Sequence, residues 1–414
     1  MGSAIVITNA SRVVNGLTGA DEVSEKISYV REELRLPDEA IAINAGSWGP
    51  LCSAARKAIA EGYEAASRSR GDDPAYMREG GSGLARYDEV IGEAKEELGG
   101  FLNCSPDEVA LCDSTTTAMN IFLWGYDFQP GDEVVVGSLE NPAALVPLRV
   151  NALRRGIRLV YSGVGNDGRD ASEALAVAIT PRTRMILISD VNYATGSRVD
   201  LRAISRVAHE EDVLVLSDGI QAVGTQPVDL RALEVDGYAM ARHKFLCGPD
   251  GAGALYVREE ALSHIHPTYT GVFSASGHGM GEGLVLMETA QRFEVSTRPL
   301  PVILGGTACL RWLGEKVGWP YVYGRCRDLY NGLWDRLSVI PGVTLVSGRD
   351  QSSLLTFSVE GMDPNDVVAR LRESNIFTRT ISVSELVGVR LSVGFWNRES
   401  DLDIIEAAVG SLAS

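Results

Sequence analysis

Short apolar runs alternate with longer amphipathic stretches through the middle of the chain. The runs are rich in β-branched residues, and the stretches between them, such as residues 201–210, place apolar side chains at helical spacing. This alternation predicts an α/β fold in which a mostly parallel sheet is covered by helices. The five expected strands are residues 133–136, 158–161, 184–189, 213–217 and 253–257.

The pattern changes after residue 300, where helical stretches at 308–337 and 365–374 are interleaved with short strand-like segments. The strand-like segments are residues 342–346, 353–359 and 388–393. A chain of 414 residues also fits two domains at the usual size of ~100–200 residues each. We therefore expect an N-terminal arm (1–40), a large domain (41–300) and a smaller α+β C-terminal domain (301–414), which the arm joins.

Composition and charge exclude several classes of function. The chain is 45% hydrophobic and 22% charged, as in ordinary globular proteins, and its formal net charge of -17 disfavours nucleic acid and anionic membranes as partners. Its apolar runs fall short of the ~20 residues that a membrane helix needs. The six cysteines are scattered without a metal-like spacing, and the start does not look like a signal peptide. These features predict a soluble cytoplasmic protein without a metal site.

The residues from 214 to 257 carry the densest chemical signal. Asp218 follows an apolar strand, at the carboxyl end where parallel sheets bind ligands, and such an anion can keep a pyridinium nitrogen protonated. Lys244 follows His243 in a glycine-rich context, where a desolvated amine can attack a carbonyl carbon. Taken alone, Asp218 reads as a helix cap and Lys244 as a solvated side chain; the ordered set is far more specific.

A second motif lies upstream, in Asp-Ser-Thr-Thr-Thr-Ala-Met-Asn at residues 113–120. Hydroxyl groups and free amides at the start of a helix suit a phosphate dianion. Thr115 and Thr116 are the candidate phosphate ligands. A simple helix N-cap is the alternative.

Together these motifs resemble the class V aminotransferase family of fold type I pyridoxal-phosphate (PLP) enzymes, over residues 44–397. The resemblance implies that Asp218 and Gln221 contact the pyridine nitrogen and phenolic oxygen of PLP. It implies that Lys244, paired with His243, holds PLP as a Schiff base and then moves the α-proton of the substrate. Asn44, where the resemblance begins, is assigned to the substrate site.

The resemblance also implies a homodimer and a site for the substrate carboxylate. Thr297, in Arg-Phe-Glu-Val-Ser-Thr at 292–297, matches a threonine that reaches the cofactor phosphate of the neighbouring subunit. Arg390 matches the arginine that grips the substrate carboxylate, a task suited to a planar guanidinium. Arg379 is either a second carboxylate ligand or a surface residue.

The sequence departs from its relatives at four positions near the expected site. Asn141 stands where many relatives stack a histidine on the cofactor ring, and an amide can cover the ring but cannot shuttle a proton. Tyr193 either faces the cofactor or substrate, as a catalytic candidate, or packs in the core. Ala241 replaces a hydroxyl residue and Arg242 a glycine. Arg242 therefore either contacts the phosphate or forms a structural ion pair.

The region that precedes Arg390 has no cysteine from Ser374 onward. A desulfurase of this family carries its persulfide there, because a thiolate must accept the sulfur. The sequence thus favours a C–S lyase that performs β-elimination on L-cysteine, cystine or a cysteine S-conjugate, in specialised metabolism for example.

Other reactions at the same site stay open. The alternatives are an epimerase, an aminotransferase or a decarboxylation-coupled deaminase that acts on an amino-acid moiety of a specialised metabolite. Cleavage of the kynureninase type is supported only by the stretch around Tyr193. A non-catalytic binding protein would be expected to lose the cofactor residues, and Asp218, Gln221 and Lys244 are all present.

Overall fold

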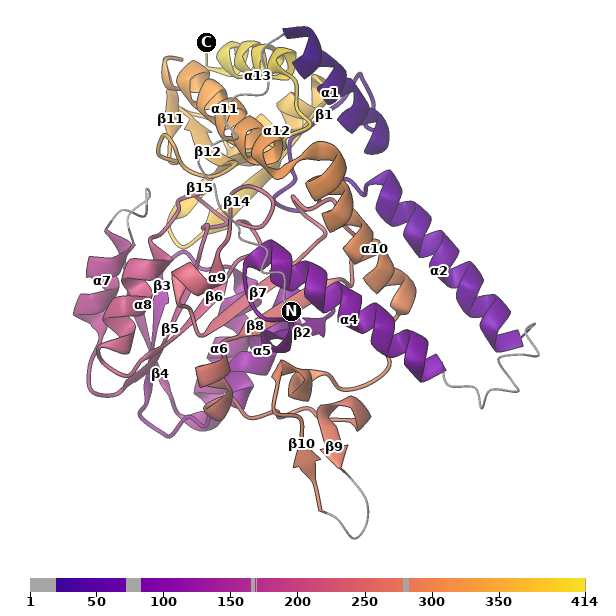
Figure 1. Ribbon diagram of the computed structural model, residues 1–414. Coiled ribbons are helices and arrows are strands. Elements are labelled where there is room, and N and C mark those ends of the chain that lie inside the picture. Colours follow the sequence, from indigo (N-terminus) through magenta and orange to yellow (C-terminus); the bar gives the residue numbers. More distant parts are fainter. Residues whose placement is uncertain (1–19, 72–82, 165–167, 169, 278–282, 414) are drawn as a thin grey trace, which may run out of the picture.

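A seven-stranded sheet forms the centre of the larger part of the molecule (Figure 1). The structure is a computed structural model that describes residues 20–71, 83–164, 168, 170–277 and 283–413. The strand order is β2-β8-β7-β6-β5-β3-β4, with parallel pairs from β7 to β4 and β8 antiparallel to both its neighbours, so the predicted mostly parallel sheet is confirmed. The strands are β2 (Val109–Cys112), β3 (Glu133–Gly137), β4 (Arg158–Ser162), β5 (Thr183–Ser189), β6 (Leu214–Asp218), β7 (Gly237–Ala241) and β8 (Gly253–Val257).

Helices cover both faces of this sheet, which explains why its inner strands are apolar without alternation. On one face lie α4 (Gly83–Leu102), α7 (Ala171–Ala178), α8 (Leu201–His209) and α10 (Leu300–Arg311). The opposite face is covered by α5 (Thr115–Gly125) and α6 (Pro142–Arg155). Helix α2 (Ser53–Gly71) packs on α10, and the short α9 (Leu230–Leu233) connects β6 to β7.

A four-stranded antiparallel sheet, in the order β11-β12-β15-β14, forms a separate core with three helices. The N-terminal segment joins this part, because β1 (Ile41–Ala42) pairs in parallel with β13 (Ile376–Phe377) after helix α1 (Ala20–Glu33). The exact domain boundaries stay a prediction. The remaining elements here are β11 (Val343–Leu345), β12 (Leu354–Val359), β14 (Arg379–Val383), β15 (Leu386–Ser392), α11 (Trp319–Ser338), α12 (Pro364–Glu373) and α13 (Glu399–Leu412).

The single helix expected over residues 308–337 is wrong. Helix α10 ends at Arg311, a π-helical turn follows at Trp312–Val317, and α11 begins only after Gly318. Gly318 has φ +89°, a conformation that other residues rarely adopt, and Pro320 then sits in the first turn of the new helix. The chain therefore changes direction where the sequence pattern looked continuous.

A small hairpin of β9 (Ala275–Gly277) and β10 (Val285–Leu286) projects from the large part, at the bottom of Figure 1. Within the described part of the chain, no helix has the length and apolar character needed to cross a membrane.

Asp236, just before β7, contacts two strands of the large sheet and one helix that covers it. Its side chain is fully buried and accepts a hydrogen bond from the amide of Val215 at 2.7 Å. It also forms an ion pair with Arg258 (2.7 Å) and a hydrogen bond with the Nε2 of His209 (2.9 Å). One carboxylate thus connects β6, α8 and the end of β8.

We expect Asp236→Ala to lower the free energy of unfolding by roughly 3 kcal/mol, because it leaves buried donors without a partner. Chemical denaturation measures the loss. The matched control is Asp403→Ala, which removes a mainly exposed ion pair with Arg336 and should cost less than about 1 kcal/mol. Equal losses in the two variants would contradict the assigned role of Asp236.

Candidate active site

Lys244 and Asp218 lie at the carboxyl end of the large sheet. Asp218 is the last residue of β6, and Lys244 follows β7 in the loop that leads to β8; both side chains are buried. The Asp218 carboxylate accepts a hydrogen bond from the amide of Ile220 at 3.0 Å. This edge is where parallel sheets bind ligands, as the sequence predicted.

The surroundings of Lys244 favour a neutral amine. Burial lowers the pKa of Lys244 to about 7; Asp218 opposes this shift, and Arg390 and Arg379 add to it. Burial also raises the pKa of Asp218, against the hydrogen bond from Ile220 and the charge of Lys244. Near neutral pH a large fraction of the lysine is therefore unprotonated and able to attack an aldehyde.

The segment from Asn44 to Gly49 closes on the backbone of the lysine. The amide of Gly49 donates a hydrogen bond to the carbonyl of His243 at 2.9 Å. A Cβ atom on Gly49 would lie 1.8 Å from the carbonyl oxygen of Lys244, so only glycine fits there. Gly46 is less confined, because the atoms nearest to its Cβ would be side-chain atoms, among them a terminal nitrogen of Arg390 at 2.8 Å.

Gln221 lies in the turn after Asp218, and its side chain is buried. Its Nε2 donates to the carbonyl of Gly46 at 3.0 Å, whereas its Oε1 has no hydrogen-bond partner. An amide that is anchored at one end and unsatisfied at the other suits a polar atom of a bound group.

The first turn of α5 has the groups that a phosphate requires. The hydroxyl of Thr115 is buried and has no hydrogen-bond partner in the described part of the chain. The amides of Thr115 and Thr116 donate no hydrogen bond to any described residue. The N-cap alternative is also real, since the Ser114 hydroxyl accepts from the amide of Thr117 at 3.1 Å. The cap satisfies the later amide and leaves the two earlier ones free for an anion.

Arg379 and Arg390 lie directly opposite each other on β14 and β15. Each donates a hydrogen bond to the hydroxyl of Ser47 at 3.2 Å, and Ser47 donates to the Oδ1 of Asn44 at 2.9 Å. Burial, followed by the charge of Arg379, lowers the pKa of Arg390 to about 9. Two adjacent guanidinium groups without a carboxylate between them form a ready site for an anionic substrate group.

Ser47 was missed by the sequence reasoning, although it holds both arginines and separates Asn44 from them. The sequence did contain a signal for Ser47, because it lies between Gly46 and Gly49 in the segment that begins at Asn44, and closely spaced glycines indicate a tight approach of the backbone. Trp48 was missed as well. Its ring lies 5.9 Å from that of His243, and its Nε1 donates to Asp250 at 2.8 Å.

Tyr193, in the loop after β5, contacts Arg390, and Asn141 lies in the loop after β3. The carbonyl of Tyr193 accepts from Arg390 at 2.8 Å; burial raises the pKa of its half-buried phenol, and Arg390 and Arg379 oppose that rise. Asn141 is the N-cap of α6, where its Oδ1 accepts from the amide of Ala143 at 2.8 Å. Its predicted place over the cofactor ring stays a prediction, as does the catalytic role of Tyr193.

Arg242 is buried, yet it forms no ion pair within the described part of the chain. Its guanidinium packs against α10, where a Cβ on Gly306 would lie 2.6 Å from its NH1. Side chains alternate along β7, so that Met240 packs on the α10 face of the sheet and Ala239 on the α5 face; Arg242, just after the strand, lies on the same face as Met240. The ion-pair alternative is thus unsupported, and a phosphate contact by Arg242 stays a prediction.

His243 and Thr297 occupy more open positions. His243 is partly buried, and burial followed by the charge of Lys244 lowers its pKa. Thr297 is exposed, between the 3-10 helix Ala290–Phe293 and α10. The contact of His243 with the cofactor and the contact of Thr297 with the cofactor phosphate of the neighbouring subunit stay predictions.

The family model for class V aminotransferases matches residues 75–405. The chain belongs to the class V aminotransferase family. A probable cysteine desulfurase from Methanothermobacter thermautotrophicus is 27% identical over 406 residues, which cover 93% of this chain and 97% of that relative.

Two solved structures of the protein C-DES are similar to this class V chain. One is a lysine-to-alanine mutant with glycine covalently linked to its PLP cofactor; it has a TM-score of 0.84 and 27% identity, and covers 92% of this chain and 98% of that chain. The other is the cystine C-S lyase C-DES in complex with its reaction product cysteine persulfide, with a TM-score of 0.83, 28% identity and coverage of 90% and 98%.

These similarities confirm the fold type I architecture and PLP as the cofactor of this class V enzyme. The described residues fit PLP. A buried lysine with a lowered pKa interacts with the charge of a buried aspartate, and the Oε1 of Gln221 in the following turn has no partner among the described residues. The start of α5 adds amide groups that are free to bind a phosphate.

We expect Asp218→Asn to lower the pKa of Lys244 further, because it removes the negative charge that favours the ammonium form. The rate at which apoprotein binds PLP, followed by the visible absorbance over a range of pH, should rise through about pH 7 in the native chain. In the variant the midpoint should move to lower pH. The exposed Asp212→Asn serves as control and should leave the midpoint in place; an upward shift in Asp218→Asn would refute this account.

Proposed function

We propose that this class V enzyme is a PLP-dependent C–S lyase that performs β-elimination on L-cysteine, cystine or a cysteine S-conjugate. The observation that carries the proposal is the connection between the two arginines. Strands β14 and β15 are joined by a tight turn at Ser384 and Glu385, with Ser384 at φ +51°. The turn leaves no room for a loop that presents a thiol to the substrate.

The cysteines of the chain support this reading. None lies between Ser374 and Arg390, and all six are buried. Burial raises the pKa of Cys112 and of Cys326 to about 12 in each case, so these thiols stay protonated. A buried thiol is a poor acceptor for sulfur, which disfavours a persulfide-forming desulfurase. The likeness to the cystine C-S lyase C-DES supports the same substrate class.

Each residue of the site has a separate role in the proposed reaction. Arg390 and Arg379 grip the carboxylate of the amino acid, and the Lys244 amine takes the proton from its α-carbon. Asp218 keeps a proton on the pyridine nitrogen, so that bound PLP supplies an electron sink for the charge left on that carbon. The sulfur group then leaves the β-carbon as a thiolate, or as a persulfide anion when the substrate is cystine. With one water consumed, the products are that thiol or persulfide, pyruvate and ammonium.

We propose further that the active enzyme is a homodimer in which Thr297 of one subunit reaches the phosphate site of the other. The exposure of Thr297 next to α10 supports an intersubunit role. His243, Arg242 and Asn141 are proposed as additional contacts of the cofactor, and Tyr193 as a residue that faces the substrate.

The decisive experiment measures pyruvate, ammonia, free thiol and alanine after incubation with cystine and a panel of S-conjugates. A lyase gives pyruvate with an equal amount of ammonia, and Lys244→Ala should abolish both. Formation of alanine together with protein-bound persulfide would identify a desulfurase and refute the proposal. Epimerised or transaminated products without pyruvate would instead support the other reactions of the same cofactor.

We expect Arg390→Lys to raise KM for the amino-acid substrate by roughly 10- to 100-fold, with a smaller change in kcat. A lysine cannot form the two parallel hydrogen bonds that a guanidinium gives to a carboxylate. Steady-state kinetics with pyruvate detection measures the effect. Arg372→Lys, at an exposed position of α12, is the control, and an unchanged KM in Arg390→Lys would rule out the carboxylate role.

A further inference from the structure

A second cavity, of about 1050 Å³, lies apart from the residues of the active site. Five regions of the chain border it: α1, the loop between β5 and α8 that carries Arg198, the turn after β6, the start of α11 and the loop between β11 and β12. Its volume is at the upper end of the range for small-molecule sites. The cavity therefore lies between the large sheet, the smaller sheet and the N-terminal helix.

Two cations that line the cavity, Arg198 and Lys26, form no ion pair among the described residues. Asp328 pairs with Arg327 and Asp350 with Arg349, while the Nζ of Lys26 donates to the carbonyl of Lys316 at 2.7 Å. The guanidinium of Arg198 has neither a hydrogen bond nor an ion pair among the described residues; only its backbone amide is bonded, to Gln351 at 2.8 Å. Burial raises the pKa of Asp190, and the hydrogen bond from Tyr238 and then the charge of Arg198 oppose that rise. The N–H groups of the Arg198 guanidinium nevertheless stay free to bind a singly charged anion such as a carboxylate.

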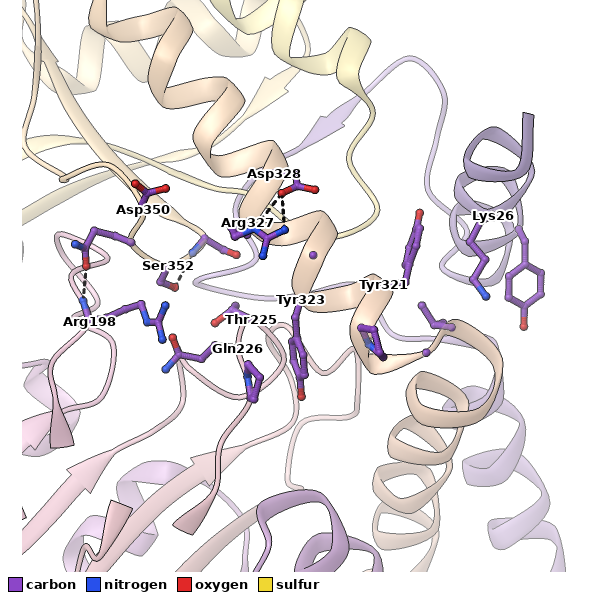
Figure 2. Close-up of a pocket in the computed structure, with 18 of the residues that line it drawn as sticks. Lys26, Arg198, Thr225, Gln226, Tyr321, Tyr323, Arg327, Asp328, Asp350 and Ser352 are labelled. Atoms are coloured by element: carbon purple, nitrogen blue, oxygen red, sulfur yellow. Dashed lines mark hydrogen bonds and ion pairs between the residues drawn. The ribbon is translucent and has the colours of Figure 1, made fainter. Parts of the chain in front are cut away.

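Polar groups surround Arg198, and tyrosine rings line part of the rest of the cavity together with further charged residues. Figure 2 shows Arg198 with Thr225, Gln226 and Ser352 at one end, Lys26 at the other, and the rings of Tyr323 and Tyr321 between them. Gln226 is 9% exposed, and its Oε1 has no partner. The cavity thus offers an anion contact next to flat aromatic walls.

This cavity is connected to the cofactor site through buried hydrogen bonds. The Nε2 of Gln226 donates to Asp190 at 3.1 Å, and the amide of Asp190 donates to the carbonyl of Asp218 at 3.1 Å. Tyr238 donates to the same Asp190 carboxylate at 2.8 Å. A ligand that contacts Gln226 would therefore bind to a residue that is hydrogen-bonded to Asp190, and Asp190 in turn is hydrogen-bonded to the strand end at Asp218.

We propose that the cavity is a binding site for a small carboxylic acid with a planar apolar body, separate from the substrate site. The carboxylate pairs with Arg198, and the planar body lies against Tyr323. Because the cavity is bordered by both sheets, the bound acid holds the two parts of the chain together and stabilises the folded enzyme.

Benzoate is a suitable probe, and benzamide, which has the same shape without the charge, is its matched control. Isothermal titration of the PLP-loaded full chain should show benzoate binding at least tenfold tighter than benzamide binding, together with a rise in Tm. Equal binding of the two compounds, or no binding of benzoate up to about 10 mM, would refute the proposal.

Three variants locate the site. Arg198→Gln should weaken benzoate binding at least tenfold, and Arg202→Gln, at an exposed position of α8, should leave it unchanged. Arg390→Lys should also leave it unchanged. If binding is lost in Arg390→Lys and kept in Arg198→Gln, the acid occupies the substrate site and the proposal is wrong.

Discussion

The buried amine of Lys244 is the constraint on which the rest of the site depends. An ammonium in this position would be costly, because burial and two nearby arginines all act against its charge, and only Asp218 favours it. The protein resolves the conflict by leaving the lysine largely neutral, which is the state that a nucleophile requires. The same low-polarity surroundings keep the neighbouring arginines without a counter-ion until an anionic substrate arrives.

The sequence predicted the parts of the site that follow from strand ends and motifs. Asp218 and Lys244 lie at the carboxyl edge of a mostly parallel sheet, as expected from the apolar run before Asp218 and the glycine-rich stretch after Lys244. The threonines lie at the start of a helix, where phosphate and cap interpretations turned out to be compatible. Local patterns are enough for these features because each depends on residues close together in the chain.

Features that depend on distant segments escaped the sequence. Ser47 connects to Arg379 and Arg390 only after the N-terminal segment has crossed to the small sheet, and no local pattern records that crossing. The break at Gly318 was hidden because apolar spacing continues through it, so the change of φ has no hydrophobic signature. The direction of the Arg242 side chain likewise depends on a distant segment, because the guanidinium occupies the space that Gly306 leaves on helix α10.

The pairing of β1 with β13 has a consequence for the order in which the enzyme can be assembled. Ile41 finds its partner only at Ile376, and the carbonyl of Ile43 receives its hydrogen bond from Ser392. During synthesis on the ribosome, the pairing of residues 41–43 must therefore wait until residues 376–392 have emerged. The large sheet can form earlier, but the segment that lies against Lys244 gains these contacts only after the small sheet has been synthesised.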